Sequence, residues 1–294
     1  TLVITVALCF NASADDGKVV IDNVVYELNT KDYLNEKYGE HYVVTDYFFD
    51  DSLISKTTKL KITDEIDGIE VKGIDHYSTY EESVINRISL PNTIKYVGEC
   101  SFGYFPEIEE IILPSGLESI GRHCFHELKS LKSISIPASL KVISAYAFFG
   151  CTSLESVTFE GDLIGIEYYA FENCTNLASI TFPNSLEYIG EEAFRNCDSL
   201  KKVVIPAKTK VFRKAFEYCD SLEKLVIDYG ESNDKGEIYI SDAFDACNIK
   251  AIYLKALPEK YRFDITFEEA GNIKDIYFAG SPSLWNKHTT KEQR

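Results

Sequence analysis

The sequence predicts an α/β solenoid, in which stacked repeats carry parallel strands on a concave face and turns or short helical pieces on a convex face. Three observations predict this fold class. Phenylalanine recurs every 23 residues through the middle of the chain, and columns of leucine, isoleucine and proline share that period. Apolar and polar residues also alternate just before the prolines, as in strands with one buried face.

The phenylalanine column is the clearest sign of the repeat. Its regular members are Phe102, Phe125, Phe148, Phe171 and Phe194, followed by Phe216 and Phe244 at spacings of 22 and 28 residues. The repeating unit reads P-x-x-L-x-x-I-x-x-x-A-F-x-x-C-x-x-L-x-x-I-x-I. A fixed period of about 20–29 residues with leucine columns is typical of a leucine-rich-repeat solenoid.

The strand of each unit is expected at its alternating segment. Residues 133–136 read Ser-Ile-Ser-Ile and residues 179–182 read Ser-Ile-Thr-Phe. Pro137 and Pro183 then end these strands, because proline cannot donate a backbone hydrogen bond to a neighbouring strand. A single unit cannot bury its own apolar stripe, so successive units must stack and share a core.

These repeats resemble the BspA-type leucine-rich repeat family, whose members are surface and secreted proteins of anaerobic bacteria and some protists. Residues 189–200 (IGEEAFRNCDSL) carry the I-G-x-x-A-F-x-x-C-x-x-L signature nearly complete. The resemblance covers roughly residues 62–280. The sequence departs from the pattern where Lys208 is expected to replace the leucine of its column, and where residues 228–255 form a longer, polar unit.

The predicted domain organisation has four parts. Residues 1–14 resemble a signal peptide that lacks its basic start, because an apolar run is followed by small residues at Ala12 and Ala14. A buried N-terminal strand is the alternative for this segment. Residues 15–61 are expected to cap the solenoid of residues 62–280, with regular units over 91–227 and an irregular unit over 228–255. Residues 281–294 are expected to be a truncated C-terminal end.

Charge and hydropathy exclude several classes of partner. The formal net charge is −17, from 30 basic and 47 acidic residues. Such a surface repels phosphate backbones and anionic lipids, so we expect no nucleic acid as a partner and no membrane insertion. No apolar run is long enough to span a membrane.

Seven cysteines remain after the predicted signal peptide, and an export route favours disulfides. However, five of them occupy one repeat position, three residues after the phenylalanine. Side chains one repeat apart point the same way from parallel segments, at a spacing wider than a disulfide prefers. We therefore predict a column of buried free thiols.

No motif for catalysis, a cofactor or a metal is present, so we expect a non-enzymatic protein without a cofactor. His123 and His126 flank Phe125 and superficially suggest a metal pair, but both occupy variable repeat positions and are expected to face solvent. The acidic insert of residues 228–237 lacks the order of a calcium loop, so a solvated loop is expected there.

Two surfaces are candidates for binding. The first is the outward face of the strands, whose small polar and basic residues are Ser133, Ser135, Ser156, Thr158, Ser179, Thr181, Lys202 and Lys224. The second is an aromatic column, His123, Tyr146 and Tyr169, two residues before the phenylalanine. Each has a purely structural alternative: a soluble sheet face for the first, and rings that pack only on one another for the second.

The family resemblance implies a secreted or cell-surface recognition and adhesion scaffold. Its expected partners are proteins or glycans on host or neighbouring cells. The alternative is an accessory repeat module of a larger secreted enzyme or cell-wall-anchored protein.

Overall fold

The structure is a computed structural model. It describes residues 18–21, 24–28, 37–39, 41–47, 59–66, 68–75, 85–206, 208–228, 238–239, 242–255, 263–264 and 273–278. The predicted signal peptide, the acidic insert of residues 229–237 and the C-terminal residues 279–294 lie outside these ranges. The predicted domain boundaries stay predictions.

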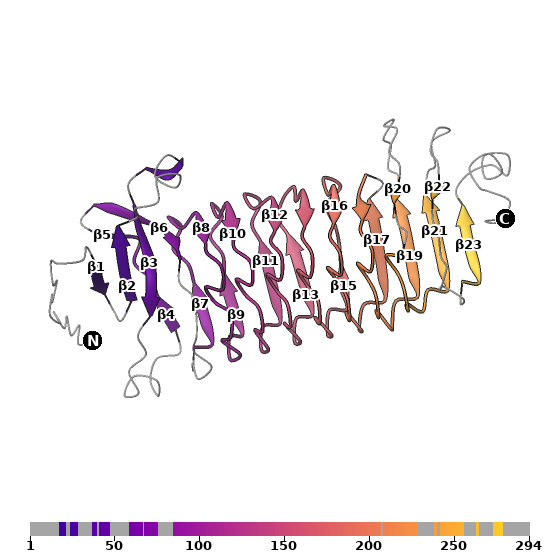
Figure 1. The fold of residues 1–294 in the computed structure, drawn as a ribbon, viewed down its shortest axis with the longest axis horizontal. Coiled ribbons are helices and arrows are strands. Elements are labelled where there is room, and N and C mark those ends of the chain that lie inside the picture. The colour runs from indigo at the N-terminus through magenta and orange to yellow at the C-terminus, as the bar shows by residue number, and fades with distance from the viewer. Residues whose placement is uncertain are drawn as a thin grey trace, which may run out of the picture.

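The chain winds into coils that stack along one long axis, with the N-terminal strands at one end and the last strand at the other (Figure 1). At the N-terminal end, β1 (Lys18–Ile21), β2 (Val24–Leu28) and β3 (Tyr42–Tyr47) pair antiparallel. Strand β3 then pairs parallel with β6 (Ile69–Ile74), which also forms a hairpin with β5 (Glu65–Ile66). This pairing joins the N-terminal strands to the first coils.

One row of parallel strands runs the length of the solenoid and confirms the alternating segments as strands. It comprises β4 (Lys59–Lys61), β7 (Arg87–Ser89), β9 (Glu110–Ile112), β11 (Ser133–Ile136), β13 (Ser156–Phe159), β15 (Ser179–Ile180), β17 (Lys202–Pro206), β19 (Lys224–Asp228), β21 (Ala251–Lys255) and β23 (Asp275–Phe278). The register advances by one repeat per strand, since Ser133 pairs with Ser156 and Ser156 with Ser179.

A second row of short parallel strands occupies the L-x-x-I stretch, for which the sequence predicts turns or helical pieces. Its members are β8 (Tyr96–Val97), β10 (Ser119–Ile120), β12 (Val142–Ile143), β14 (Gly165–Ile166), β16 (Tyr188–Ile189), β18 (Lys210–Val211), β20 (Ile238–Tyr239) and β22 (Phe263–Asp264). Residues 85–206 contain strands and turns and no helix. Extended backbone suits the β-branched residues here, and each coil supplies hydrogen-bond partners for the next.

The phenylalanine column forms the centre of the core. Adjacent rings from Phe102 to Phe244 stack with centroids 5.0–5.9 Å apart. Phe171 is fully buried between Phe148 and Phe194. The predicted inward phenylalanine column is therefore confirmed.

The cysteine column is also confirmed, because all seven cysteines of the described residues are buried and none forms a disulfide. Each thiol of the regular position donates a hydrogen bond to the phenylalanine carbonyl of the preceding coil. Cys151 Sγ, for example, lies 3.2 Å from the carbonyl oxygen of Phe125. The same bond recurs from Cys174, Cys197, Cys219 and Cys247. The column thus satisfies a carbonyl that faces the dry interior.

One sequence assignment is wrong in the coil that follows Pro206. Thr209, and not Lys208, occupies the leucine position: Thr209 is 1% exposed, whereas Lys208 is exposed. The Thr209 backbone N–H donates to the Pro206 carbonyl at 3.0 Å, as that of Leu186 does to Pro183. The threonine hydroxyl donates to the Leu186 carbonyl at 2.9 Å, so burial leaves no polar atom of this side chain without a partner.

Two positions of each repeat adopt the left-handed backbone conformation. The sequence pattern does not predict this. The first lies two residues before each phenylalanine, with φ of 54–58° at Cys100, His123, Tyr146, Tyr169, Glu192, Lys214 and Asp242. The second lies two residues after it, with φ of 56–70° at Tyr104, Glu127, Gly150, Asn173, Asn196, Tyr218 and Ala246. We call the outward surface formed by side chains at these two positions of successive coils, and by the residues next to them, the turn face. The two reversals flank the inward phenylalanine, and apart from the buried Cys100 the side chains at these positions are partly or fully exposed wherever the residue is not glycine.

Candidate functional site

The outward face of the long strands, here the strand face, carries the first set of candidate residues. Ser133, Ser135, Ser156, Thr158, Ser179 and Thr181 are all exposed on three neighbouring strands or just after them. Ser135 Oγ donates to Glu160 Oε1 at 2.7 Å. The structure therefore brings these hydroxyls together as a flat field of small polar groups.

The C-terminal part of the strand face differs in character. Lys202 is exposed, whereas Lys224 is half-buried with its Nζ 3.8 Å from the ring centroid of Tyr253. Tyr253 in turn stacks on Tyr277 at 4.5 Å. The ammonium of Lys224 is thus engaged by an aromatic ring of its own sheet.

The turn face carries the second candidate set. The rings of His123 and Tyr146 stack at 4.4 Å, and those of Tyr146 and Tyr169 at 4.7 Å. This spacing matches that between neighbouring strands, because each ring comes from the same position of successive coils. The rings cover one another's faces, so the stack presents mainly ring edges and hydroxyl groups outward.

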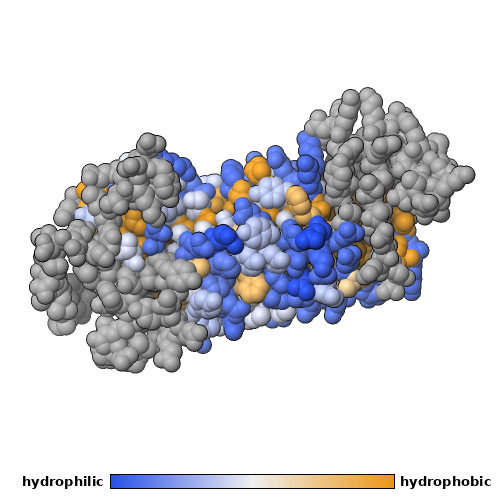
Figure 2. All heavy atoms as spheres, in the orientation of Figure 1, coloured by the Kyte–Doolittle hydropathy of each residue, from blue (hydrophilic) through white to orange (hydrophobic). Residues whose placement is uncertain are grey.

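Two neighbours that the sequence reasoning missed extend this stack. Tyr168 is 38% exposed and lies edge-on to both Tyr146 and Tyr169. The Arg122 guanidinium lies 5.9 Å from the ring of Tyr146 and 5.6 Å from that of Tyr168. Both residues stand three residues before the repeat phenylalanine, where the coils carry unlike side chains, so the repeat pattern offers no signal for them. Figure 2 shows a mostly hydrophilic surface over the central coils with isolated hydrophobic residues.

Burial and charge affect the titration of the stacked groups. Burial, with Glu192 nearby, raises the pKa of Tyr169 to about 12, and the Tyr169 hydroxyl donates to Glu192 Oε1 at 3.2 Å. Burial likewise raises the pKa of Tyr146 and lowers that of His123. At neutral pH the tyrosines are therefore protonated hydrogen-bond donors, and the imidazole is uncharged.

The expectation of solvent-facing histidines is wrong for His126. Its side chain is 4% exposed, and its Nδ1–H donates to the carbonyl of His123 at 2.5 Å. Gly103 leaves the room, since a Cβ there would lie 2.1 Å from the imidazole. His123 is half-exposed in the aromatic stack. The described residues contain no group of three or more side chains able to hold a metal ion.

A cluster of charges adjoins the aromatic stack. The Arg195 guanidinium lies 3.3 Å from a Glu172 oxygen, 3.4 Å from Glu192 and 2.9 Å from Glu217. Glu172 and Glu217 are 7% and 6% exposed. Burial raises the pKa of Glu172, and the charge of Arg195 opposes that shift. One guanidinium thus holds together carboxylates from three coils.

Replacing Arg195 with methionine should destabilise the protein by about 2 kcal/mol, because it removes the cation that pairs with the buried Glu172 carboxylate and leaves Glu217 with Lys214 alone. Burial already raises the pKa of Glu172 and Arg195 opposes that shift, so loss of the cation raises this pKa further. The deficit should therefore shrink as pH falls from 7 towards 4 and Glu172 takes up a proton. Urea unfolding at several pH values measures both effects.

Arg213→Met is the matched control, since Arg213 pairs with Glu191 at an exposed position. We expect it to change stability little at any pH. Equal losses in the two variants, or a deficit of Arg195→Met that grows at low pH, would contradict this account of the cluster.

The repeats match those of a known protein family. The pattern of the BspA type Leucine rich repeat region matches residues 72–164 and 118–249, in six copies. No curated protein matches. No helix of the described residues is both long and apolar enough to cross a membrane.

Several solved structures are similar. A leucine-rich repeat protein of T. pallidum is 25% identical, with a TM-score of 0.50, over 78% of this chain and 86% of its own. One from Bacteroides ovatus is 18% identical over 88% of this chain and 76% of its own, with a TM-score of 0.46. A leucine-rich cell surface protein of Faecalibacterium prausnitzii is 15% identical over 93% of this chain and 98% of its own, with a TM-score of 0.39.

The matched repeats cover more than half of the chain, and their columns are those that stack in the core. The protein belongs to the BspA-type leucine-rich repeat family.

Proposed function

We propose that this protein is a secreted or cell-surface recognition and adhesion scaffold without enzymatic activity. It binds a protein or glycan partner on host or neighbouring cells through its turn face. The observation that carries the proposal is the stack of His123, Tyr146 and Tyr169, flanked by Arg122 and the exposed ring of Tyr168.

The chemistry of the two faces favours the turn face. Tyrosine and arginine dominate the energetic centres of binding interfaces, whereas serine and threonine are under-represented there. The strand face offers small hydroxyls, and Lys224 is already engaged by Tyr253. The turn face offers large rings and a guanidinium that successive coils hold in place, so little side-chain entropy is lost on binding.

The non-enzymatic part of the proposal is supported by the state of the buried charges. The acidic groups beside the stack, Glu172 and Glu217, form ion pairs with Arg195. They thereby support the coils and are not free to act as acid or base.

A binding screen of the purified chain against glycans, host proteins and intact cells tests the proposal. Saturable binding that competes with unlabelled protein is expected. Absence of binding throughout the screen would contradict it. So would turnover in a panel of esterase, protease and glycosidase substrates.

Export is supported by the sequence at the N-terminus and predicts a defined mature end. If cleavage follows Ala14, N-terminal sequencing of exported protein should begin at Asp15. An exported protein that retains residues 2–10 would contradict this prediction.

A further inference from the structure

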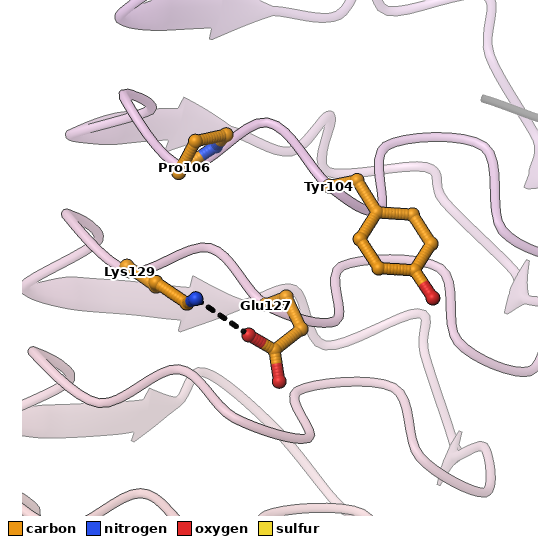
Figure 3. Close-up of a pocket in the computed structure, with 4 residues that line it drawn as sticks. All are labelled: Tyr104, Pro106, Glu127 and Lys129. Carbon is orange, nitrogen blue, oxygen red and sulfur yellow. Dashed lines mark ion pairs between the residues drawn. The ribbon is translucent and has the colours of Figure 1, made fainter. Parts of the chain in front are cut away.

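A second site lies on the turn face, where an open pocket of about 330 Å³ is formed between two coils. Tyr104 and Pro106 come from one coil, and Glu127 and Lys129 from the next (Figure 3). The Tyr104 ring is 44% exposed. The volume is at the small end of the range of ligand sites in proteins.

The orientation of the Tyr104 ring is fixed by the buried side chain on which it packs. The ring packs edge-on against the imidazole of His126, with centroids 4.2 Å apart and planes at 80°. His126 is itself buried, held by the His123 carbonyl and accommodated by Gly103. Gly103 and His126 occupy the same position of neighbouring coils. The ring therefore has a rigid seat that the repeat pattern alone does not provide.

The Glu127 carboxylate has its own support. Gly150 has φ of 70°, and a Cβ there would lie 2.4 Å from Glu127 Oε1. The same position in the following coils holds Asn173 and Asn196. Glycine at this one coil therefore leaves the space that the carboxylate occupies. In the same coil, Lys129 Nζ lies 3.2 Å from Glu127 Oε2 (Figure 3).

The chemistry of these groups suits a neutral sugar. The Tyr104 ring and Pro106 form an apolar wall for the C–H face of a pyranose ring. The carboxylate accepts hydrogen bonds from sugar hydroxyls and the ammonium donates to them. Because Glu127 and Lys129 already neutralise each other, a charged ligand would have to compete with the ion pair. A polyhydroxyl ligand can bridge both groups and leave the pair intact.

We propose that this pocket binds a single neutral hexopyranose unit of a glycan. The inference rests on the proposed function, since it names the class of ligand that one part of the turn face recognises. For one ring we expect weak binding, with a dissociation constant on the order of 1 mM, because so few atoms are in contact.

Saturation-transfer difference NMR on the full chain tests the proposal. The probes are methyl hexopyranosides, with N-acetylneuraminic acid and an arginine-containing peptide as charged competitors. Saturation of a neutral hexoside, with little effect of either competitor, is expected. Tyr104→Ala and Glu127→Gln should each weaken binding at least 10-fold.

Tyr218→Ala is the matched control. Tyr218 occupies the same repeat position as Tyr104, is also 44% exposed and has φ of 59° against 62°. Its ring lies beneath the Arg195 guanidinium at 5.4 Å. This variant should bind hexosides like the wild type. The thermal midpoints of all three variants should stay near that of the wild type, because the changed groups are exposed or at the surface.

Four outcomes would overturn the inference. They are no saturation of any neutral hexoside, preferential binding of N-acetylneuraminic acid, preferential binding of the peptide, and equal losses in Tyr104→Ala and Tyr218→Ala. Cell binding measured in parallel separates the two proposals. If hexosides fail while wild-type protein still binds cells, the pocket assignment is wrong and the recognition function stands. If wild-type protein binds no cells and nothing else in the screen, the recognition function itself is wrong.

Discussion

Phe171→Ala should lower the free energy of unfolding by about 3–5 kcal/mol, the cost of a large-to-small change at a packed core position. Phe171 has no exposed surface, and its ring stacks on Phe148 at 5.2 Å and on Phe194 at 5.1 Å. The substitution therefore leaves a cavity with rigid walls on both sides. Equilibrium urea unfolding of the full chain measures the loss.

Phe244→Ala provides the matched comparison within the same column. Phe244 is 5% exposed, and among the described residues one ring, Phe216, stacks on it at 5.0 Å. The site can relax more easily, so the loss should be clearly smaller than at Phe171. Small and equal losses in the two variants would show that the phenylalanine column is not the centre of the fold.

The thiols Cys151, Cys174 and Cys197 should react with an alkylating reagent at least about 1,000-fold more slowly in the native protein than in the unfolded chain. All three are fully buried, and burial raises the pKa of Cys151 to about 12 and raises those of Cys174 and Cys197. At pH 8 a rise of about three pKa units lowers the thiolate population by a factor of about 1,000, and lack of access adds to this.

Cys247 is the internal control for the thiol column. It is 7% exposed and adjoins the irregular part of the chain, so it should be the most reactive of the five cysteines that lie three residues after the phenylalanine. Mass spectrometry after timed alkylation gives the site-specific rates. Under denaturing and non-reducing conditions, disulfide-linked peptides that join Cys151 to Cys174 or Cys174 to Cys197 would show that the repeat register is wrong.

The repeat columns were predictable because each side chain packs against the residue at the same position of the next coil. A phenylalanine such as Phe171 packs on the same residue of the next coil, so periodicity in sequence becomes contact in space. The same reasoning locates the buried thiols and the alternating strands. Both rest on one coil being like the next.

The rest of the fold depends on backbone pairing and backbone conformation, which do not appear as a pattern in the sequence. Two-residue strands such as β12 exist because β14 offers carbonyl and N–H partners in register. Thr209 can replace a leucine because its hydroxyl donates to the Leu186 carbonyl. One residue fewer separates Thr209 from the following strand than separates Leu186 from its own. The left-handed positions tolerate tyrosine and glutamate as well as asparagine, so composition gives little indication of them.

The candidate site was predictable only in part. The column of His123, Tyr146 and Tyr169 follows from the period, and the structure stacks the three rings. The Tyr104 pocket was missed, because it depends on two glycines, Gly103 and Gly150, in different coils. Each glycine matters through the neighbouring side chain for which it leaves room.

The proposal that the turn face is the recognition surface is the central claim, and one paired measurement tests it most directly. Cell binding is compared between a turn-face variant, Arg122→Ser with Tyr168→Ser, and a strand-face variant, Ser156→Arg with Thr158→Arg. All four side chains are exposed and belong to neighbouring coils, so both variants should fold. The turn-face variant should lose at least 10-fold in affinity, while the strand-face variant should change less than 2-fold. A large loss in the strand-face variant with unchanged binding of the turn-face variant would contradict the claim.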